Sequence, residues 1–117
     1  MVTNQTTLNL VFLNSLLDKK EEFGHYDHNF ISDCIQLLLE VPMQPIINPL
    51  PNGLLQWTYT TKNKKAELEL HPDGTMVSYR STYTGVQEYI PSQKTSVENI
   101  RKEIDWLKEE IEEVILE

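Results

Sequence analysis

A periodic row of apolar side chains in residues 96–117 limits the fold of this chain more than any other feature. Its members recur at spacings of three and four residues, at Val97, Ile100, Ile104, Leu107, Ile111 and Val114. This spacing is the heptad pattern of a helix that buries one stripe of side chains against a neighbouring surface. The sequence therefore predicts a long amphipathic C-terminal helix over residues 95–117, with a stripe that another surface must cover.

Two surfaces could cover this stripe. In a parallel coiled coil, the stripe would be the seam of a homodimer, and Glu103 would lie near Lys108 of a second copy of the chain. Alternatively, the helix would lie across a sheet of its own domain, since an open sheet face needs a covering layer. Trp106 and Ile115 widen the apolar surface beyond a strict seam, which favours packing on the chain's own core or on a second partner.

Negative charge is concentrated in the same segment. The chain has a formal net charge of −8, and residues 96–117 hold eight acidic and three basic side chains, which is −5 of that total. A negative field repels phosphate, so we expect no direct binding to nucleic acid and a basic surface on the protein partner. The residues that we expect to bind this partner are Glu103, Asp105, Trp106, Glu109, Glu110 and Glu113.

The apolar patterns predict a single α+β domain over residues 1–117. Helical spacing in residues 6–22 and 30–41 makes residues 1–41 a pair of helices, the second capped by Asn29 or Ser32. Four prolines make residues 42–53 a linker, in which Ile46 and Ile47 could form an edge strand. Alternating apolar residues over 54–90 predict a meander of four antiparallel strands, with a tight turn at residues 72–74.

Short signals set the limits of the sheet and of the last helix. Pro91 and the polar residues after it should end the sheet, because proline removes a ladder donor. Thr95 and Glu98 have the spacing of a capping box, which predicts the start of the C-terminal helix.

The aromatic residues of the predicted strands are expected on both sides of the sheet. Trp57 fits the apolar alternation and should be buried, with Tyr79 as its neighbour across the sheet. Tyr83 and Tyr89 fall near the last turn and the last strand, where exposure is expected.

Nothing in the chain suggests export or membrane insertion. Cys34 is the single cysteine and cannot form an internal disulfide, and the first residues lack the basic start of a signal peptide. Apolar runs are far shorter than the roughly 18 residues of a membrane span. We therefore expect a cytoplasmic protein that does not bind membranes.

Few residues suggest catalysis or metal binding. His25 and His28 have the H-x-x-H spacing of metal ligands, but a closed zinc site needs further ligands. Cys34 falls on the apolar side of a predicted helix, where a buried and inert thiol is expected. We therefore expect no catalytic residues, no cofactor and no metal.

One part of the chain resembles a known group of proteins. The residues PIINPLPNGLLQW at 45–57, the ELEL run at 67–70 and the PDG turn at 72–74 resemble small uncharacterised bacterial and mobile-element proteins. The likeness spans residues 23–81, although Phe23 stands where that group usually has a tryptophan, and the His25 to His28 run replaces small residues. The group has no established activity, so the resemblance implies the architecture and an accessory role without a site.

Three functions follow from these observations. The first is a non-enzymatic accessory protein, such as an inhibitor, immunity protein or antitoxin, that binds a basic protein partner. The second is an anti-defence protein of a mobile element or phage, whose carboxylates imitate nucleic acid on a nuclease. The third is a small enzyme or metal-binding protein that uses the loop of His25 and His28.

Overall fold

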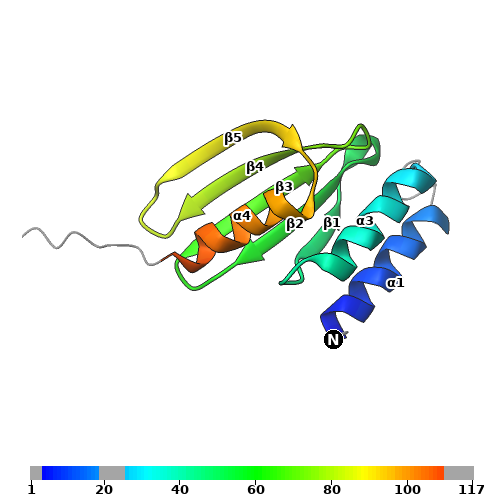
Figure 1. The fold of residues 1–117 in the computed structure, drawn as a ribbon, viewed down its shortest axis with the longest axis horizontal. Helices are drawn as coiled ribbons and strands as arrows, with labels where there is room; N and C mark the ends of the chain where they lie inside the picture. Colours follow the sequence, from blue (N-terminus) through cyan, green and yellow to red (C-terminus); the bar gives the residue numbers. More distant parts are fainter. Residues whose placement is uncertain (1–3, 19–25, 110–117) are drawn as a thin grey trace, which may run out of the picture.

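The described residues form an antiparallel five-stranded sheet with helices on one face. The computed structural model describes residues 4–18 and 26–109. In chain order these residues form α1 (Asn4–Asp18), α3 (His28–Glu40), β1 (Ile46–Pro49), the short 3-10 helix η1 (Pro51–Gly53), β2 (Leu55–Thr60), β3 (Lys64–Leu70), β4 (Thr75–Thr82), β5 (Gln87–Lys94) and α4 (Val97–Lys108). The strands lie side by side in sequence order, and the predicted α+β class is confirmed (Figure 1).

The predicted number of four strands is wrong, because the proline-rich segment contributes β1. This strand pairs antiparallel with β2, from Ile46 opposite Thr58 to Pro49 opposite Leu55. An edge strand tolerates proline, since one side of its backbone needs no ladder partner. Residues 42–53 are therefore part of the sheet as well as a connection.

The prediction that Pro91 ends the sheet is also wrong. β5 continues through Pro91 to Lys94, and its pairing with β4 shifts between Met76 and Ser78. Ile90 lies opposite Ser78 and Gln93 opposite Met76, so two residues of β5 face one residue of β4. This β-bulge on an edge strand accommodates the proline without ending the ladder.

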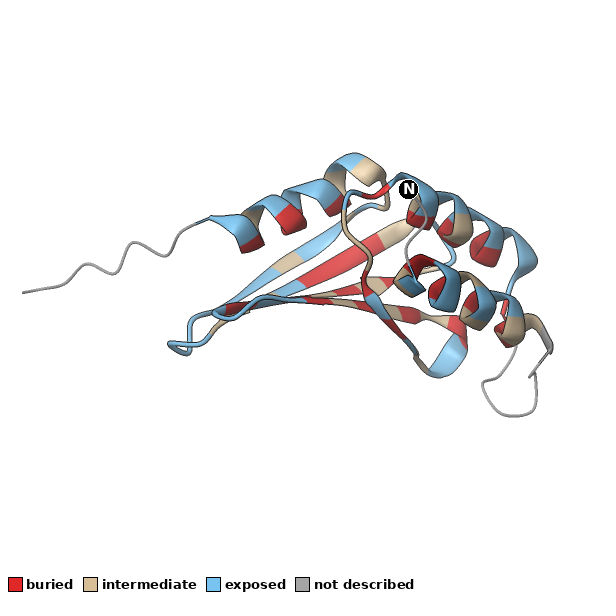
Figure 2. Ribbon diagram, turned by 90° about the horizontal axis from the view of Figure 1, so that it is seen from below, coloured by how far each residue is buried: buried red, intermediate tan, exposed pale blue. Residues whose placement is uncertain are grey.

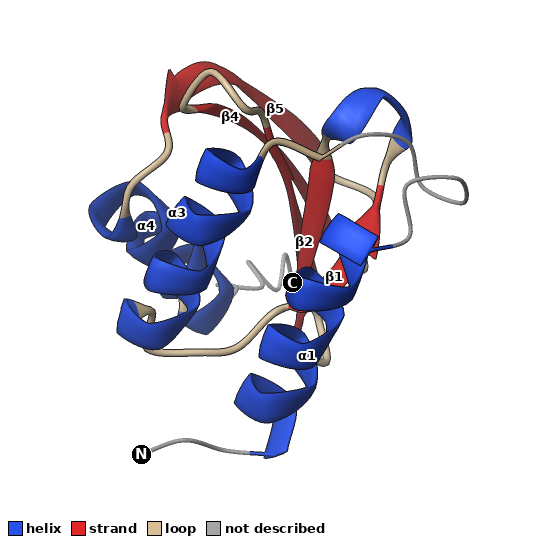
Figure 3. Ribbon diagram, turned by 90° about the vertical axis from the view of Figure 1, so that its right-hand side faces the viewer, coloured by secondary structure: helices blue, strands red, loops and turns tan. Residues whose placement is uncertain are grey.

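The sheet has a covered face and an uncovered face. The helices α1, α3 and α4 lie on the same side of the sheet, and no described α-helix lies on the other side (Figures 2 and 3). Alternate residues of each strand point to opposite faces, so Leu55, Trp57 and Tyr59 of β2 are buried beneath the helices. Leu68 and Leu70 of β3 join them in one continuous core that also includes residues of all three helices.

The two N-terminal helices pack on each other and on one end of the sheet. Leu13 and Leu16 of α1 and Ile31 and Leu38 of α3 are buried in the shared core. The predicted caps of α3 are wrong, because the carboxylate of Asp27 accepts hydrogen bonds from the first backbone N–H groups of the helix.

Among residues 4–18 and 26–109, none of the helices has the length and apolar composition that a membrane span requires.

Buried polar groups tie these helices to the sheet. The side-chain amide of Asn9 in α1 donates to the carbonyl oxygen of Pro45, just before β1, at 3.0 Å. Tyr59 of β2 donates its hydroxyl proton to the carbonyl oxygen of Met43 at 2.9 Å. The hydroxyl of Tyr26 reaches the carbonyl oxygen of Leu54 at 2.9 Å and so holds η1 against the start of α3.

The C-terminal helix covers the other end of the sheet and is shorter than predicted. Ser96, not Thr95, is the N-cap of α4, and its hydroxyl accepts from the backbone N–H of Asn99 at 3.1 Å. The helix ends at Lys108, because the backbone of Glu109 is extended (φ −63°, ψ 132°). The remaining part of the predicted helix, residues 110–117, lies outside the described residues.

Candidate functional site

Four of the six residues of the heptad stripe are described, and three of them are buried inside this chain. Ile100, Ile104 and Leu107 belong to the core under α4, and Val97 is half-buried. These side chains therefore cover the sheet of their own chain, and the three core members have no surface left for a second copy. Ile111 and Val114 lie outside the described residues.

The prediction that Glu103 binds a partner is wrong, because its carboxylate is part of the core. The side chain of Glu103 is 1% exposed and accepts hydrogen bonds from Nε and Nη2 of Arg80 on β4. The Nε to Oε1 distance is 3.0 Å, and the hydrogen bond to Glu103 raises the pKa of the Arg80 guanidinium. A buried carboxylate needs such a partner, since an unpaired buried charge is strongly destabilising.

Trp106 also has an internal role in the structure. Its half-buried ring packs against the core, with Lys64 Nζ 4.8 Å and Arg80 Cζ 5.2 Å from the ring centroid. Lys64 is buried and donates to the carbonyl oxygens of Trp106 and Glu109 at 2.6 and 2.8 Å. A lysine at these carbonyl oxygens stabilises the C-terminal end of the helix, so the cluster fixes α4 on the sheet.

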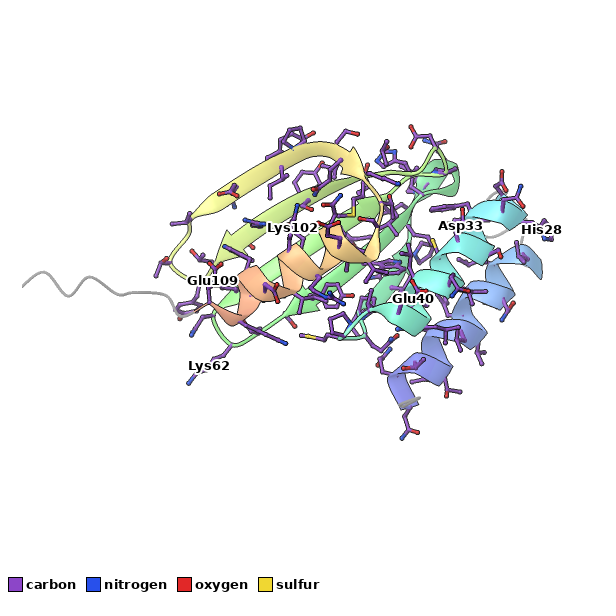
Figure 4. All side chains as sticks on the ribbon, in the orientation of Figure 1. His28, Asp33, Glu40, Lys62, Lys102 and Glu109 are labelled. Carbon is purple, nitrogen blue, oxygen red and sulfur yellow. The ribbon has the colours of Figure 1, made fainter. Side chains whose placement is uncertain are left out.

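The exposed side chains of α4 do not form an acidic surface in the described residues. The exposed charges on α4 and its C-cap are Glu98, Arg101, Lys102, Asp105, Lys108 and Glu109. They are three acidic and three basic side chains, so the local charges balance; Lys102 and Glu109 are labelled in Figure 4. The other predicted partner-binding residues, Glu110 and Glu113, lie outside the described residues.

The predicted metal-capable loop is only partly described. His28 is the exposed first residue of α3, at the opposite end of the molecule from Lys62 and Glu109 (Figure 4), whereas His25 lies outside the described residues. Within residues 4–18 and 26–109, no group of three or more His, Cys, Asp or Glu side chains is arranged to hold a metal ion.

A small cavity beside α3 contains residue types that catalysis uses. It has a volume of about 250 Å³ and is lined by Asp33, Cys34, His71 and Thr95 among others. Burial and, to a smaller extent, the charge of Asp33 raise the pKa of the Cys34 thiol to about 12. His71 Nε2 lies 2.9 Å from an oxygen of Glu69. A thiol that stays protonated at neutral pH is a poor nucleophile, so Cys34 is not activated for covalent chemistry.

The uncovered face of the sheet presents a row of side chains that crosses all five strands. The strand register aligns Ile46 with Thr58, Thr58 with Glu67, Glu67 with Tyr79, and Tyr79 with Tyr89. We call these five residues the tyrosine row. Three of them are large apolar or aromatic side chains with high exposure, at 54% for Ile46, 44% for Tyr79 and 57% for Tyr89.

The two tyrosines of this row are in contact. Their ring centroids are 5.2 Å apart with an interplanar angle of 49°. A surface hollow of about 350 Å³ is lined by both rings and by Glu67, Arg80, Ser81, Gln87 and Glu88. The carboxylate of Glu67 is also held on this face, by Lys65 at 2.6 Å and by the amide of Gln56 at 3.2 Å.

The sequence pattern contained part of the signal for this surface. Tyr79 was expected beside Trp57, but Trp57 lies between Ile47 and Leu68 on the covered face, and Tyr79 points to the other side. Glu67 and Glu69 alternate with buried leucines, which does predict their uncovered face. Their alignment with Tyr79 and Tyr89 depends on the strand register, which the pattern alone does not specify.

Comparisons of the chain with protein-family models, with curated proteins and with solved structures gave no match.

Proposed function

We propose that this protein is a non-enzymatic accessory protein that binds a basic protein partner on the uncovered face of its sheet. The observation that carries the proposal is the tyrosine row, with Ile46, Tyr79 and Tyr89 exposed together on one side of a sheet whose other side is covered. Tyrosine is enriched at protein interfaces because its ring buries a large area and its hydroxyl still forms hydrogen bonds.

The charge of the molecule supports the basic nature of the partner. The chain carries a net charge of −8, and the uncovered face places Glu67 and Glu69 together with Lys65 and Lys94. An acidic protein attracts a basic surface and accelerates its association. An inhibitor, immunity protein or antitoxin would use such a surface to hold its target.

The uncovered face is a better candidate than α4 for the binding surface. On α4, Glu103 and Trp106 are occupied by Arg80 and Lys64, and the exposed charges balance. The same observations weigh against an imitation of nucleic acid by the described part of this helix, since its acidic side chains alternate with basic ones.

Affinity capture from the native host tests this proposal. The bait would be the tagged wild-type chain, compared with the double variant Tyr79→Ser/Tyr89→Ser and with the matched control Tyr83→Ser. Tyr83 is 87% exposed at the turn after β4 and lies outside the tyrosine row. We expect the double variant to retain less than about a tenth of a captured protein, because interface tyrosines are common hot spots, and the control to retain it.

Two results would contradict the proposal. One is equal capture by the wild type and the double variant, with both folded to the same urea midpoint. The other is loss of capture in Asp105→Asn/Glu109→Gln with full capture in the tyrosine variant, which would move the binding surface to α4.

A further inference from the structure

The contacts around Tyr79 and Tyr89 identify the chemistry of the group that fits between them. The faces of both aromatic rings carry partial negative charge, and the tilted pair borders a hollow that Glu67 also lines. Glu69 follows on the same face of β3, opposite Val77. A cation is attracted to both kinds of group, the ring faces and the carboxylates.

Carboxylates outnumber cationic side chains around this site, so their charge is only partly compensated. Burial raises the pKa of the Tyr79 hydroxyl, and the nearby carboxylate of Glu69 raises it further. On the same face, Lys65 pairs with Glu67, and His71 Nε2 lies 2.9 Å from an oxygen of Glu69. Arg80 and Glu88 also line the hollow, and the Arg80 guanidinium pairs with both Glu88 and the buried Glu103, so the carboxylates around the hollow still outnumber the cations.

The carboxylates retain capacity for a further donor. The two oxygens of Glu67 are contacted by Lys65 and Gln56, with one contact on each oxygen, and a carboxylate accepts about four hydrogen bonds in total. The pair with Lys65 is solvent-exposed, so it is weak and can exchange.

We infer that the partner places an arginine side chain on the Tyr79–Tyr89 pair, with its guanidinium group directed at Glu67 and Glu69. This inference rests on the proposed function and names the group that the binding surface recognises. Arginine fits better than lysine, because its planar guanidinium stacks on aromatic rings and forms two parallel hydrogen bonds with a carboxylate. A nucleic-acid base could also stack on tyrosine, but its phosphates would meet the two carboxylates.

The test is a titration followed by NMR of the tyrosine ring resonances of the whole chain. The probe is N-acetyl-L-arginine amide, and the matched control is N-acetyl-L-citrulline amide, which has nearly the same shape without the charge. We expect saturable shifts of the Tyr79 and Tyr89 rings, with the Tyr83 ring as an internal reference that does not move. Citrulline should bind roughly fivefold more weakly or worse, as expected for the loss of a cation–π contact.

Variants and salt sharpen this test. Glu67→Gln/Glu69→Gln keeps both tyrosines and should weaken arginine binding severalfold, as should a rise in salt concentration. Equal shifts with arginine and citrulline, or no shifts at all, would overturn the inference. Shifts of the same rings with a ten-residue oligothymidine would also overturn it, in favour of a single-stranded nucleic acid.

The outcomes separate this inference from the proposed function. If arginine fails to bind but captured protein is still lost in Tyr79→Ser/Tyr89→Ser, the partner uses the surface through other groups and only the inference is wrong. If arginine binds but capture does not depend on the tyrosines, the proposed function is wrong.

Discussion

The covered and uncovered faces of the sheet are built from alternate residues of the same strands. On β3, Ala66 and Leu68 point to the helices and are fully buried, whereas Glu67 and Glu69 point to the other side and are partly exposed. The covered face therefore carries the core, and the uncovered face is free to carry contacts. This separation means that substitutions on neighbouring residues should have very different effects, which the following predictions test.

The largest effect on stability is expected at the ion pair of Arg80 and Glu103 on the covered face. Arg80→Met would leave the carboxylate of Glu103 buried without its cation, so we expect the free energy of unfolding to fall by about 3–5 kcal/mol. Urea titrations give this value. The double variant Arg80→Met/Glu103→Leu should recover most of the loss, and equal losses in the single and double variants would contradict this account.

A direct comparison of the two faces uses adjacent residues of β3. Leu68→Ala should lower the free energy of unfolding by about 3 kcal/mol, because it leaves a cavity in the core. Glu69→Gln on the uncovered face should change it by less than about 0.5 kcal/mol, since its contact with His71 is partly exposed. Similar urea midpoints for the two variants would remove the distinction between the faces.

A smaller effect is expected from a change at the N-cap of α4, the helix that covers one end of the sheet. Ser96→Ala removes the N-cap of α4 and should lower the free energy of unfolding by about 1 kcal/mol. Thr95→Ala is the matched control, because the sequence predicts Thr95 as the N-cap whereas the structure has Ser96 there. The assignment of the cap fails if thermal unfolding shows the larger effect for Thr95→Ala.

The smallest effect is expected in the β3–β4 turn, which belongs to neither face. The hydroxyl of Thr75 and then its backbone N–H donate to the carboxylate of Asp73, at 2.6 and 2.9 Å, and lower its pKa. The contribution of the Asp73 carboxylate to stability is therefore present above its unfolded pKa of about 3.9. It is lost as the pH falls through the lower pKa that Asp73 has in the folded protein. The difference in urea midpoint between the wild type and Asp73→Asn should shrink from pH 7 to pH 2, and a constant difference would contradict this.

Local patterns predicted the parts of the fold that depend on nearby residues. The hairpin of β2 and β3 follows from the alternation of Trp57 and Tyr59 with polar residues, and the turn at Asp73 and Gly74 follows from its residue types. Gly74 has a positive φ of 88°, which explains the preference for glycine at that position.

The candidate site depended on information that these patterns do not contain. Glu103 lies three residues after Ile100 and four before Leu107, so its helical spacing already placed it beside the buried stripe. Its partner Arg80 lies on a strand 23 residues earlier in the sequence, which the helical pattern does not reveal. The tyrosine row requires the register of four strand pairs, and the bulge near Pro91 requires the pairing of β5 with β4. Such long-range pairings are set by the whole sheet.

The bulge at Pro91 has a consequence for how the molecules meet at high concentration. β5 is an edge strand, and a free edge can recruit a strand from another chain and start a growing fibril. Here the regular ladder with β4 extends only from Gln87 to Ile90 before the bulge, and the proline after it has no N–H to offer. An incoming strand would find a short and interrupted template on β5, so this edge is a poor starting point for self-assembly.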